Sequence, residues 1–156
     1  MKYALSLPLF LGLALAQPGT SPFVDVPPCH WARPALEAIA RPGPQARPQP
    51  SLLLAENALL QVFEGLRCND PAWSMRFLLN PAPGFGQSQS GLRGFELRVL
   101  QSTLVGSQAT LRFSLTAVVE GATLRRNSTA RLVFGPEGWK VDYASLAALE
   151  LPLFPR

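Results

Sequence analysis

The chain has 156 residues, with 14 Lys and Arg against 10 Asp and Glu, which gives a formal net charge of +4. Only two of the basic residues are lysines, and the sequence has neither a basic block nor an aromatic ladder, so a nucleic-acid partner is not expected. Two interpretations of the positive charge stay open. It can contribute to binding of an anionic polymer such as a wall polysaccharide. Alternatively, it can result from a genome whose base composition favours arginine codons, together with solvated strand faces.

The first sixteen residues have the form of a secretory signal peptide. Lys2 precedes an apolar run at residues 4–15, and residues 14–16 read Ala-Leu-Ala, the small-x-small pattern that signal peptidase needs. The run is shorter than the about 20 apolar residues of a membrane-spanning helix, and no later run is long enough. We therefore expect cleavage after Ala16, export to the periplasm or cell envelope, and no transmembrane segment in the mature chain.

Residues 17–50 form a proline-rich segment with one short predicted helix. Pro34 is tolerated there because the first four N–H groups of a helix have no internal partner, and Pro42 ends the helix. The apolar residues that share one face at helical spacing are Trp31, Ala35, Leu36 and Ile39.

Residues 23–40 resemble the opening of an S-layer homology motif, which begins Phe-x-Asp-Val-Pro and continues with His-Trp-Ala and an apolar helix. Residues 23–32 read Phe-Val-Asp-Val-Pro-Pro-Cys-His-Trp-Ala, whereas the family's later Thr-Arg-Ala-Glu is Leu-Leu-Ala-Glu at residues 53–56. The family generally has three such motifs in tandem and binds cell-wall polysaccharide; this chain has one. The resemblance implies that Asp25, His30 and Trp31 contact such a polymer. The alternative is a helix cap for Asp25 and packing roles for His30 and Trp31.

The two cysteines of an exported chain are expected to pair. Cys29 lies at the start of the first predicted helix and Cys68 just past the end of the second, so antiparallel helices would bring them together. A Cys-x-x-Cys redox motif is absent, which favours a structural disulfide over a redox-active one. His30 is the only histidine and has no ligand partners at metal-binding spacing, so we expect no metal site and no cofactor.

Residues 51–156 are expected to form one α+β domain that begins with two helices. Ser51 is the predicted N-cap of the first helix. Asp70-Pro71 is the predicted start of a short helix over residues 72–79. The first helix has a core-facing stripe of Leu52, Ala55, Leu59, Val62, Phe63 and Leu66. On its other side lie Glu56, Asn57, Gln61 and Glu64.

Residues 94–143 predict a curved, four-stranded antiparallel meander. Apolar and polar residues alternate, and glycine-containing turns lie near residues 106, 121 and 135–138. The acids Glu96, Glu120 and Asp142 fall on the outer face with Arg98, Arg112 and Lys140, as on a solvated surface. The inner face is expected to hold Phe95, Leu97, Val99, Leu111, Phe113, Leu115, Ala117, Val119, Trp139, Val141 and Tyr143.

Helices followed by a bent meander give an α+β class, in which the helices pack on the curved sheet. The order of elements, with Gly138-Trp139-Lys140-Val141 in the last strand, resembles the nuclear transport factor 2-like superfold of ketosteroid isomerase and SnoaL, a cone of sheet around helices. A cystatin-like sheet on one helix is the alternative. The superfold includes enzymes and non-enzymes, so function depends on the site.

An isomerase-type site needs a general base inside the cone, together with a second acid or a tyrosine. The predicted inner face offers Tyr143 alone. We therefore expect a non-catalytic cell-envelope protein that contacts wall polysaccharide or another envelope protein. The alternatives are an isomerase- or hydrolase-type enzyme or ligand-binding protein using the cone, and a structural assembly component. An inward-pointing Glu64 or Arg76 would favour the enzyme. The apolar tail after Tyr143 should dock on the domain or form a homodimer contact.

Overall fold

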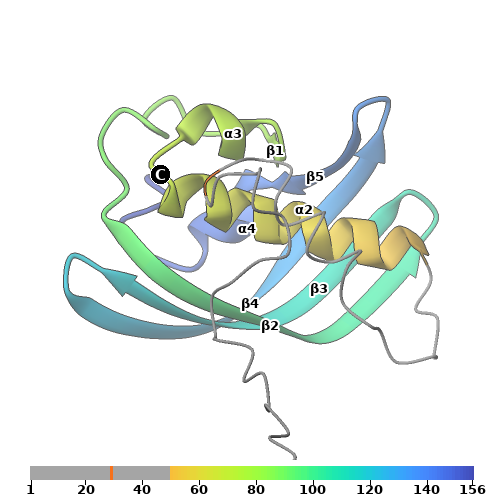
Figure 1. Ribbon diagram of the computed structural model, residues 1–156. Coiled ribbons are helices and arrows are strands. Elements are labelled where there is room, and N and C mark those ends of the chain that lie inside the picture. The colour runs from red at the N-terminus through yellow and green to blue at the C-terminus, as the bar shows by residue number, and fades with distance from the viewer. Residues whose placement is uncertain (1–28, 30–49) are drawn as a thin grey trace, which may run out of the picture.

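One long helix lies across the concave side of a curved sheet (Figure 1). The structure, a computed structural model, describes Cys29 and residues 50–156. The predicted signal peptide and the S-layer-like helix lie outside the described residues. The elements are α2 (Pro50–Arg67), α3 (Pro71–Met75), β1 (Leu78–Leu79), β2 (Leu92–Val105), β3 (Gln108–Val119), β4 (Ala122–Gly135), β5 (Gly138–Asp142) and α4 (Tyr143–Ala147).

The sheet has five strands in the order β1-β5-β4-β3-β2. The four-stranded antiparallel meander predicted from the alternating pattern is confirmed as β2 to β5. The fifth strand was not predicted. β1 pairs in parallel with β5, with Leu78 opposite Val141. The short helix predicted over residues 72–79 was therefore too long: it ends at Met75, because the following residues extend to pair with β5, and the N–H of Val141 donates to the carbonyl of Phe77 at 2.7 Å.

The core lies between α2 and the concave face of the sheet. β3 alternates regularly between exposed or half-buried and fully buried residues, and the predicted inward side is the buried one. The ring of Phe63 on α2 lies 5.6 Å from the ring of Phe95 and 5.7 Å from that of Phe154. Burying one such large side chain contributes about 1.5–3 kcal/mol. The α+β class predicted from the sequence is confirmed by this packing.

Two polar residues of α2 were placed wrongly. The helix begins at Pro50, so Ser51 lies within it and is not the N-cap. Gln61 was expected on the solvent side but is only 2 % exposed, because α3 folds back over it. The predicted cap of α3 is confirmed: the Asp70 side chain accepts a hydrogen bond from the N–H of Trp73 at 3.1 Å, with Pro71 as the first helical residue.

The C-terminal tail docks on the domain, which is one of the two predicted outcomes. Asp142 caps α4 by accepting from the N–H of Ala144. The hydroxyl of Ser145 donates to the carbonyl of Asp142 and accepts from the N–H of Arg131 on β4. Besides Tyr143, the buried apolar residues of α4 and the tail are Leu146, Leu149, Leu151, Leu153 and Phe154.

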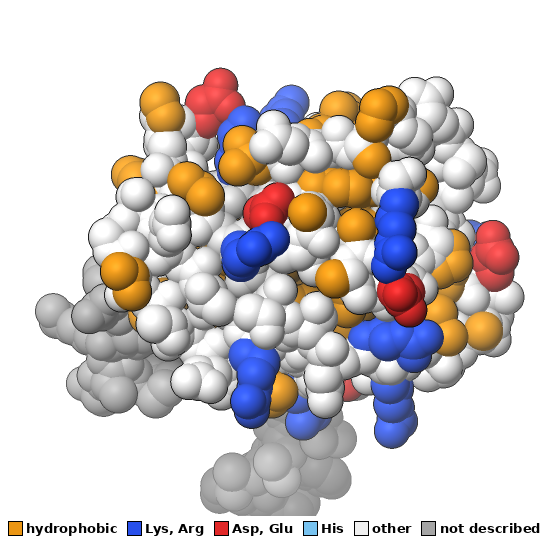
Figure 2. All heavy atoms as spheres, turned by 180° about the vertical axis from the view of Figure 1, so that it is seen from behind, with side chains coloured by type: hydrophobic (Ala, Val, Ile, Leu, Met, Phe, Trp, Pro, Cys, Tyr) orange, Lys and Arg blue, Asp and Glu red, His pale blue; other side chains and the backbone are white. Residues whose placement is uncertain are grey.

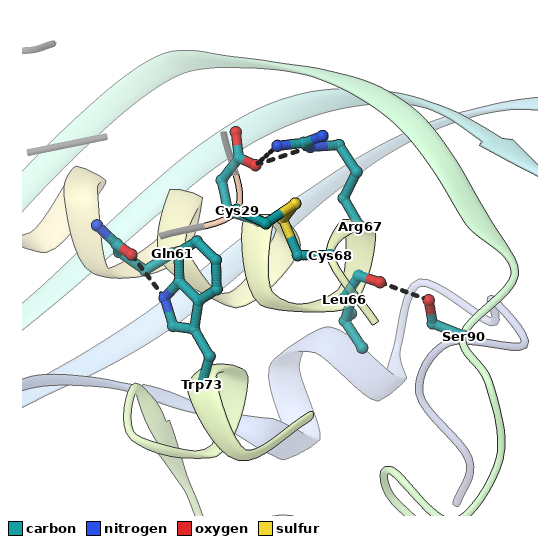
Figure 3. Close-up of a disulfide and its surroundings, with 8 residues drawn as sticks. Cys29, Gln61, Leu66, Arg67, Cys68, Trp73 and Ser90 are labelled. Carbon is teal, nitrogen blue, oxygen red and sulfur yellow. Dashed lines mark hydrogen bonds and ion pairs between the residues drawn. A yellow bond between two sulfur atoms is a disulfide. The ribbon is translucent and has the colours of Figure 1, made fainter. Parts of the chain in front are cut away.

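A disulfide joins Cys29 to Cys68, immediately after the C-terminal end of α2 (Figure 3). The two Cα atoms are 5.5 Å apart and the cysteines are separated by 39 positions in the sequence. The predicted pairing is confirmed. Because the bond closes a loop of this size, chain-entropy arguments assign it about 4 kcal/mol.

Candidate functional site

The concave face of the sheet, where an isomerase-type site would lie, is filled by packed apolar side chains. Among the described residues, the buried polar side chains besides Tyr143 are Gln61, Ser74 and Ser145, and each is hydrogen-bonded. The predicted inward residues of β3 and β5 are buried, and Phe95, Leu97 and Val99 of β2 are partly buried against the same core. The space inside the curved sheet is therefore occupied by the protein itself.

Tyr143 is the one group of the predicted inner face that could take part in isomerase-type chemistry. It is buried, and its hydroxyl donates to the carbonyl oxygen of Pro155 at 2.6 Å. Burial raises the pKa of the phenol above its ordinary value of 10.0. The ring also packs edge-on against Phe85 and Phe154. Tyr143 thus holds the C-terminal tail in place and presents no free hydroxyl.

Two ionisable residues were singled out as groups that could point inward. The carboxylate of Glu64 pairs instead with Arg67, one turn along α2, at 2.7 Å, and Arg76 is exposed at the end of α3. A different carboxylate reaches the sheet: Glu56, expected on the outer side of α2, accepts a hydrogen bond from the hydroxyl of Ser102 on β2 at 2.8 Å. The contact ties the helix to the sheet at a half-buried position.

Depressions lie at the margins of the domain. One of about 540 Å³ lies beside α4 and is lined by Asn80, Asp142, Tyr143 and Arg156 together with four alanines. A smaller one, of about 170 Å³, lies at the end of α2 near the disulfide, between the loop at residues 84–90 and the tail. In the larger depression Asp142 is already engaged, because it caps α4 and pairs with Arg131 at 2.9 Å.

The convex face of the sheet carries the charged side chains, as predicted. Seen from behind, Lys and Arg side chains are spread over the molecule, with fewer acidic side chains among them (Figure 2). We define the basic face as the outward side chains Arg98, Arg112, Arg125, Arg131 and Lys140. A groove of about 250 Å³ on this face is lined by Glu96, Arg98, Ser114, Thr116 and Arg125.

Three ion pairs neutralise part of the basic face. Arg98 pairs with Glu96 at 2.6 Å, Arg131 with Asp142 at 2.9 Å, and Lys140 with Glu137 at 2.7 Å. The hydrogen bond and charge of Lys140 lower the pKa of Glu137 below its ordinary value. Within residues 50–156, no acidic partner is present for the other two cations of the face, Arg112 and Arg125.

The residues predicted to contact wall polysaccharide, Asp25, His30 and Trp31, lie outside the described residues. The covalent neighbour of His30, Cys29, is fixed to the domain by the disulfide. Within the described part of the chain, no group of three or more His, Cys, Asp or Glu side chains is arranged to hold a metal ion. None of the described helices combines the length and apolar character needed to cross a bilayer.

Comparisons with known proteins give distant likenesses. No protein-family model matches the chain, and neither does any curated protein. Among solved structures, a nuclear transport factor 2-like superfamily protein from Salmonella enterica serovar Typhimurium LT2 is 14 % identical, with a TM-score of 0.37 over 57 % of this chain and 83 % of that one. A structure titled as a putative SnoaL-like polyketide cyclase, from Jannaschia sp. CCS1, is also 14 % identical, with a TM-score of 0.40 over 70 % of this chain and 99 % of that one. Likenesses this distant assign neither ligand nor activity.

Proposed function

We propose that this chain is an exported, non-catalytic protein of the cell envelope that acts by binding wall polysaccharide or another envelope protein. The observation that carries the proposal is the filled concave face. A proton-transfer site needs an ionisable group that a substrate can reach. In the described part of the chain, Tyr143 is buried with its hydroxyl bound to a backbone carbonyl, and the half-buried Glu56, which reaches the sheet from α2, is bound to the hydroxyl of Ser102.

The disulfide supports the extracytoplasmic part of the proposal. Bonds of this kind persist in oxidising compartments and are rare in the cytosol. Cys29–Cys68 joins the domain to the segment that resembles an S-layer homology motif, since Cys29 stands between Asp25 and His30 in the sequence. The candidate wall contacts Asp25, His30 and Trp31 are thus linked covalently to the end of α2 and not only through residues 30–49.

The test has two parts. Expression of the full chain in a bacterial host, followed by fractionation and intact-mass measurement, should recover from the envelope or periplasmic fraction a chain that starts at Gln17. The recovered protein should then co-sediment with purified cell walls, and a variant with Asp25, His30 and Trp31 all changed to Ala should bind less. Retention of the uncleaved chain in the cytoplasm overturns the proposal of export. Failure to sediment, beside a working S-layer homology control, overturns wall binding.

A second candidate is a small-ligand-binding or isomerase- or hydrolase-type protein, and it rests on the depression of about 540 Å³ beside α4. A small molecule bound there would contact Tyr143 and Arg156. An apolar-ligand screen by thermal shift tests it, with Ala147→Trp as the variant that fills the depression. Ligands that stabilise the wild type but not Ala147→Trp would favour this candidate over the first.

A further inference from the structure

Charge is unevenly paired on the convex side of the sheet. Glu96, Asp142 and Glu137 each pair with a cation of the basic face, whereas Arg112 on β3 and Arg125 on β4 have no acidic partner among the described residues. Both arginines are exposed. Their guanidinium groups are therefore available to an anionic ligand from solution.

The strand register fixes what lies between these two arginines. Arg112 is opposite Thr129, and Arg125 is opposite Thr116. Thr116 lies four residues after Arg112 on β3, so the two cationic rows are about 13 Å apart at roughly 3.3 Å per residue. The row between them is Ser114, opposite Asn127 on β4 and Arg98 on β2, and Arg98 is paired with Glu96. On a line from Arg112 to Arg125, a hydroxyl and an amide therefore separate the two arginines, beside the Glu96–Arg98 ion pair.

The groove described above contains one end of this line. Ser114 and Thr116 are half-buried and form its floor on β3, with Arg98 and Glu96 on one side and Arg125 on the other. The Glu96–Arg98 pair partly neutralises the β2 side. Arg125 is therefore the cation of the groove that remains free to pair with an incoming anion.

The edge of β4 is open at the same place. β5 pairs with β4 only over residues 132–135, so among the described strands residues 122–129 have a neighbour on one side alone. Arg126 donates from its guanidinium to the carbonyl of Arg125 at 2.9 Å and thereby occupies an acceptor near this edge. Charged side chains at an edge oppose the addition of another strand. We therefore expect a ligand to bind through the outward side chains near this edge and not by adding a strand to β4.

From this arrangement we propose that the convex sheet face, through Arg112 and Arg125, binds a linear acidic polysaccharide. Carboxylates spaced along a sugar chain match two cations about 13 Å apart. The intervening sugar hydroxyls match Ser114, Asn127 and Thr116. Duplex nucleic acid carries one charge per about 1.7 Å and calls for denser cations. Single strands call for aromatic stacking, and the outward residues of β2, β3 and β4 include no aromatic side chain.

This inference rests on the proposed envelope function, for which it names the class of polymer. Its test uses the exported chain with the disulfide intact and polygalacturonate as the probe, with neutral dextran and duplex DNA as competitors. Binding to polygalacturonate is measured at about 50 and 200 mM salt, because a contact with anionic groups weakens as the ionic strength rises. The variant is Arg112→Gln with Arg125→Gln. Its matched control is Arg76→Gln with Arg93→Gln, which removes the same charge from exposed positions just after α3 and at the start of β2.

The expected result is a loss of affinity of about tenfold or more in Arg112→Gln/Arg125→Gln and less than about threefold in the control, with unchanged circular dichroism spectra and melting temperatures in both. Equal losses in both variants would mean non-specific attraction and would overturn the proposal. So would tighter binding of DNA than of polygalacturonate, or the absence of polygalacturonate binding by the wild type. If the wild type and Arg112→Gln/Arg125→Gln sediment equally with cell walls, this inference fails while the proposed function stands. A chain that is not exported removes the proposed function whatever the sheet face binds.

Discussion

The indole N–H of Trp73 on α3 donates a hydrogen bond to the side-chain oxygen of Gln61 on α2 at 2.7 Å, and both side chains are buried (Figure 3). A second bond joins the same two helices, from the hydroxyl of Ser74 to the carbonyl of Val62 at 2.7 Å. Together they hold the five-residue α3 against the end of α2. The position of the following strand, β1, depends on this contact because only two residues separate it from α3.

Replacing Gln61 with Leu should lower the free energy of unfolding by about 1–3 kcal/mol, since the indole N–H is then buried without an acceptor. Denaturant unfolding followed by circular dichroism measures it. The control is a double-mutant cycle with Trp73→Phe. If the hydrogen bond is responsible, Gln61→Leu costs less in the Trp73→Phe background, and the coupling lies within about 0.5–3 kcal/mol. Additive effects of the two substitutions would contradict this explanation.

Gly65→Ala should destabilise the protein, although replacing a helical glycine with alanine ordinarily stabilises by about 0.5–1 kcal/mol. A Cβ at this position would contact the hydroxyl of Ser74 and lie 2.7 Å from its backbone nitrogen. Relieving that overlap moves α3 away from α2, at a cost of about 1–3 kcal/mol. Gly94→Ala on β2 is the matched control, because its Cβ would meet nothing within 4 Å. A melting temperature for Gly65→Ala at or above that of Gly94→Ala would be inconsistent with the packing described.

Tyr143→Phe should cost about 0.5–1.5 kcal/mol by removing the hydrogen bond to Pro155. It should also change the pH dependence of stability. Because burial raises the pKa of Tyr143 in the folded state, the unfolded chain releases this proton first. The stabilising contribution is complete below the ordinary value of 10.0 and is lost as the pH rises from there through the folded pKa. Between pH 9 and 11 the wild type should lose stability faster than Tyr143→Phe.

The chain contains two tyrosines, Tyr3 and Tyr143, so a protein that starts at Gln17 reports the ionisation of Tyr143 directly by its absorbance near 295 nm. The midpoint should lie above 10.0 in the folded protein and fall on unfolding. If the free energy of unfolding changed with pH in the same way for the wild type and Tyr143→Phe across this range, burial would not be raising the pKa of the phenol.

Removing the disulfide with Cys29→Ser and Cys68→Ser together should lower the free energy of unfolding by about 2–5 kcal/mol. Without the closed loop, the unfolded chain has a higher conformational entropy. Urea unfolding of the oxidised wild type, the reduced wild type and the double variant measures it. The last two should agree. Thiol titration of the denatured, unreduced wild type should find no free thiol; two free thiols would exclude the bond.

The long strands were predictable because one face of each is buried. In β3 every second residue from Ala109 to Val119 is buried, so the apolar period of two appears directly in the sequence. β1 was not predictable, because two consecutive leucines show no alternation of apolar and polar residues. They form a strand only because Val141 and Asp142 lie beside them. The burial of Gln61 depends in the same way on tertiary packing. The apolar pattern of one helix does not predict that Trp73, on the next helix, packs over this side chain.

The candidate site was predictable in outline only. The outward position of Glu96, Arg98 and Lys140 follows from the alternation of each strand. Which cations lack a partner does not follow, because the pairing of Arg131 with Asp142 depends on the register between β4 and β5. The row that places Ser114 beside Asn127, between Arg112 and Arg125, likewise exists only once β3 and β4 are aligned. Local sequence contains no signal for either arrangement.

The bond between Cys29 and Cys68 turns the stretch between them into a covalent ring. A protease that cuts this ring once, at any peptide bond, opens it without releasing a fragment, and the two pieces separate only when a reductant is added. Outside the cell, where proteases are common and reductants scarce, Asp25, His30 and Trp31 would stay attached to the sheet domain after such a cut.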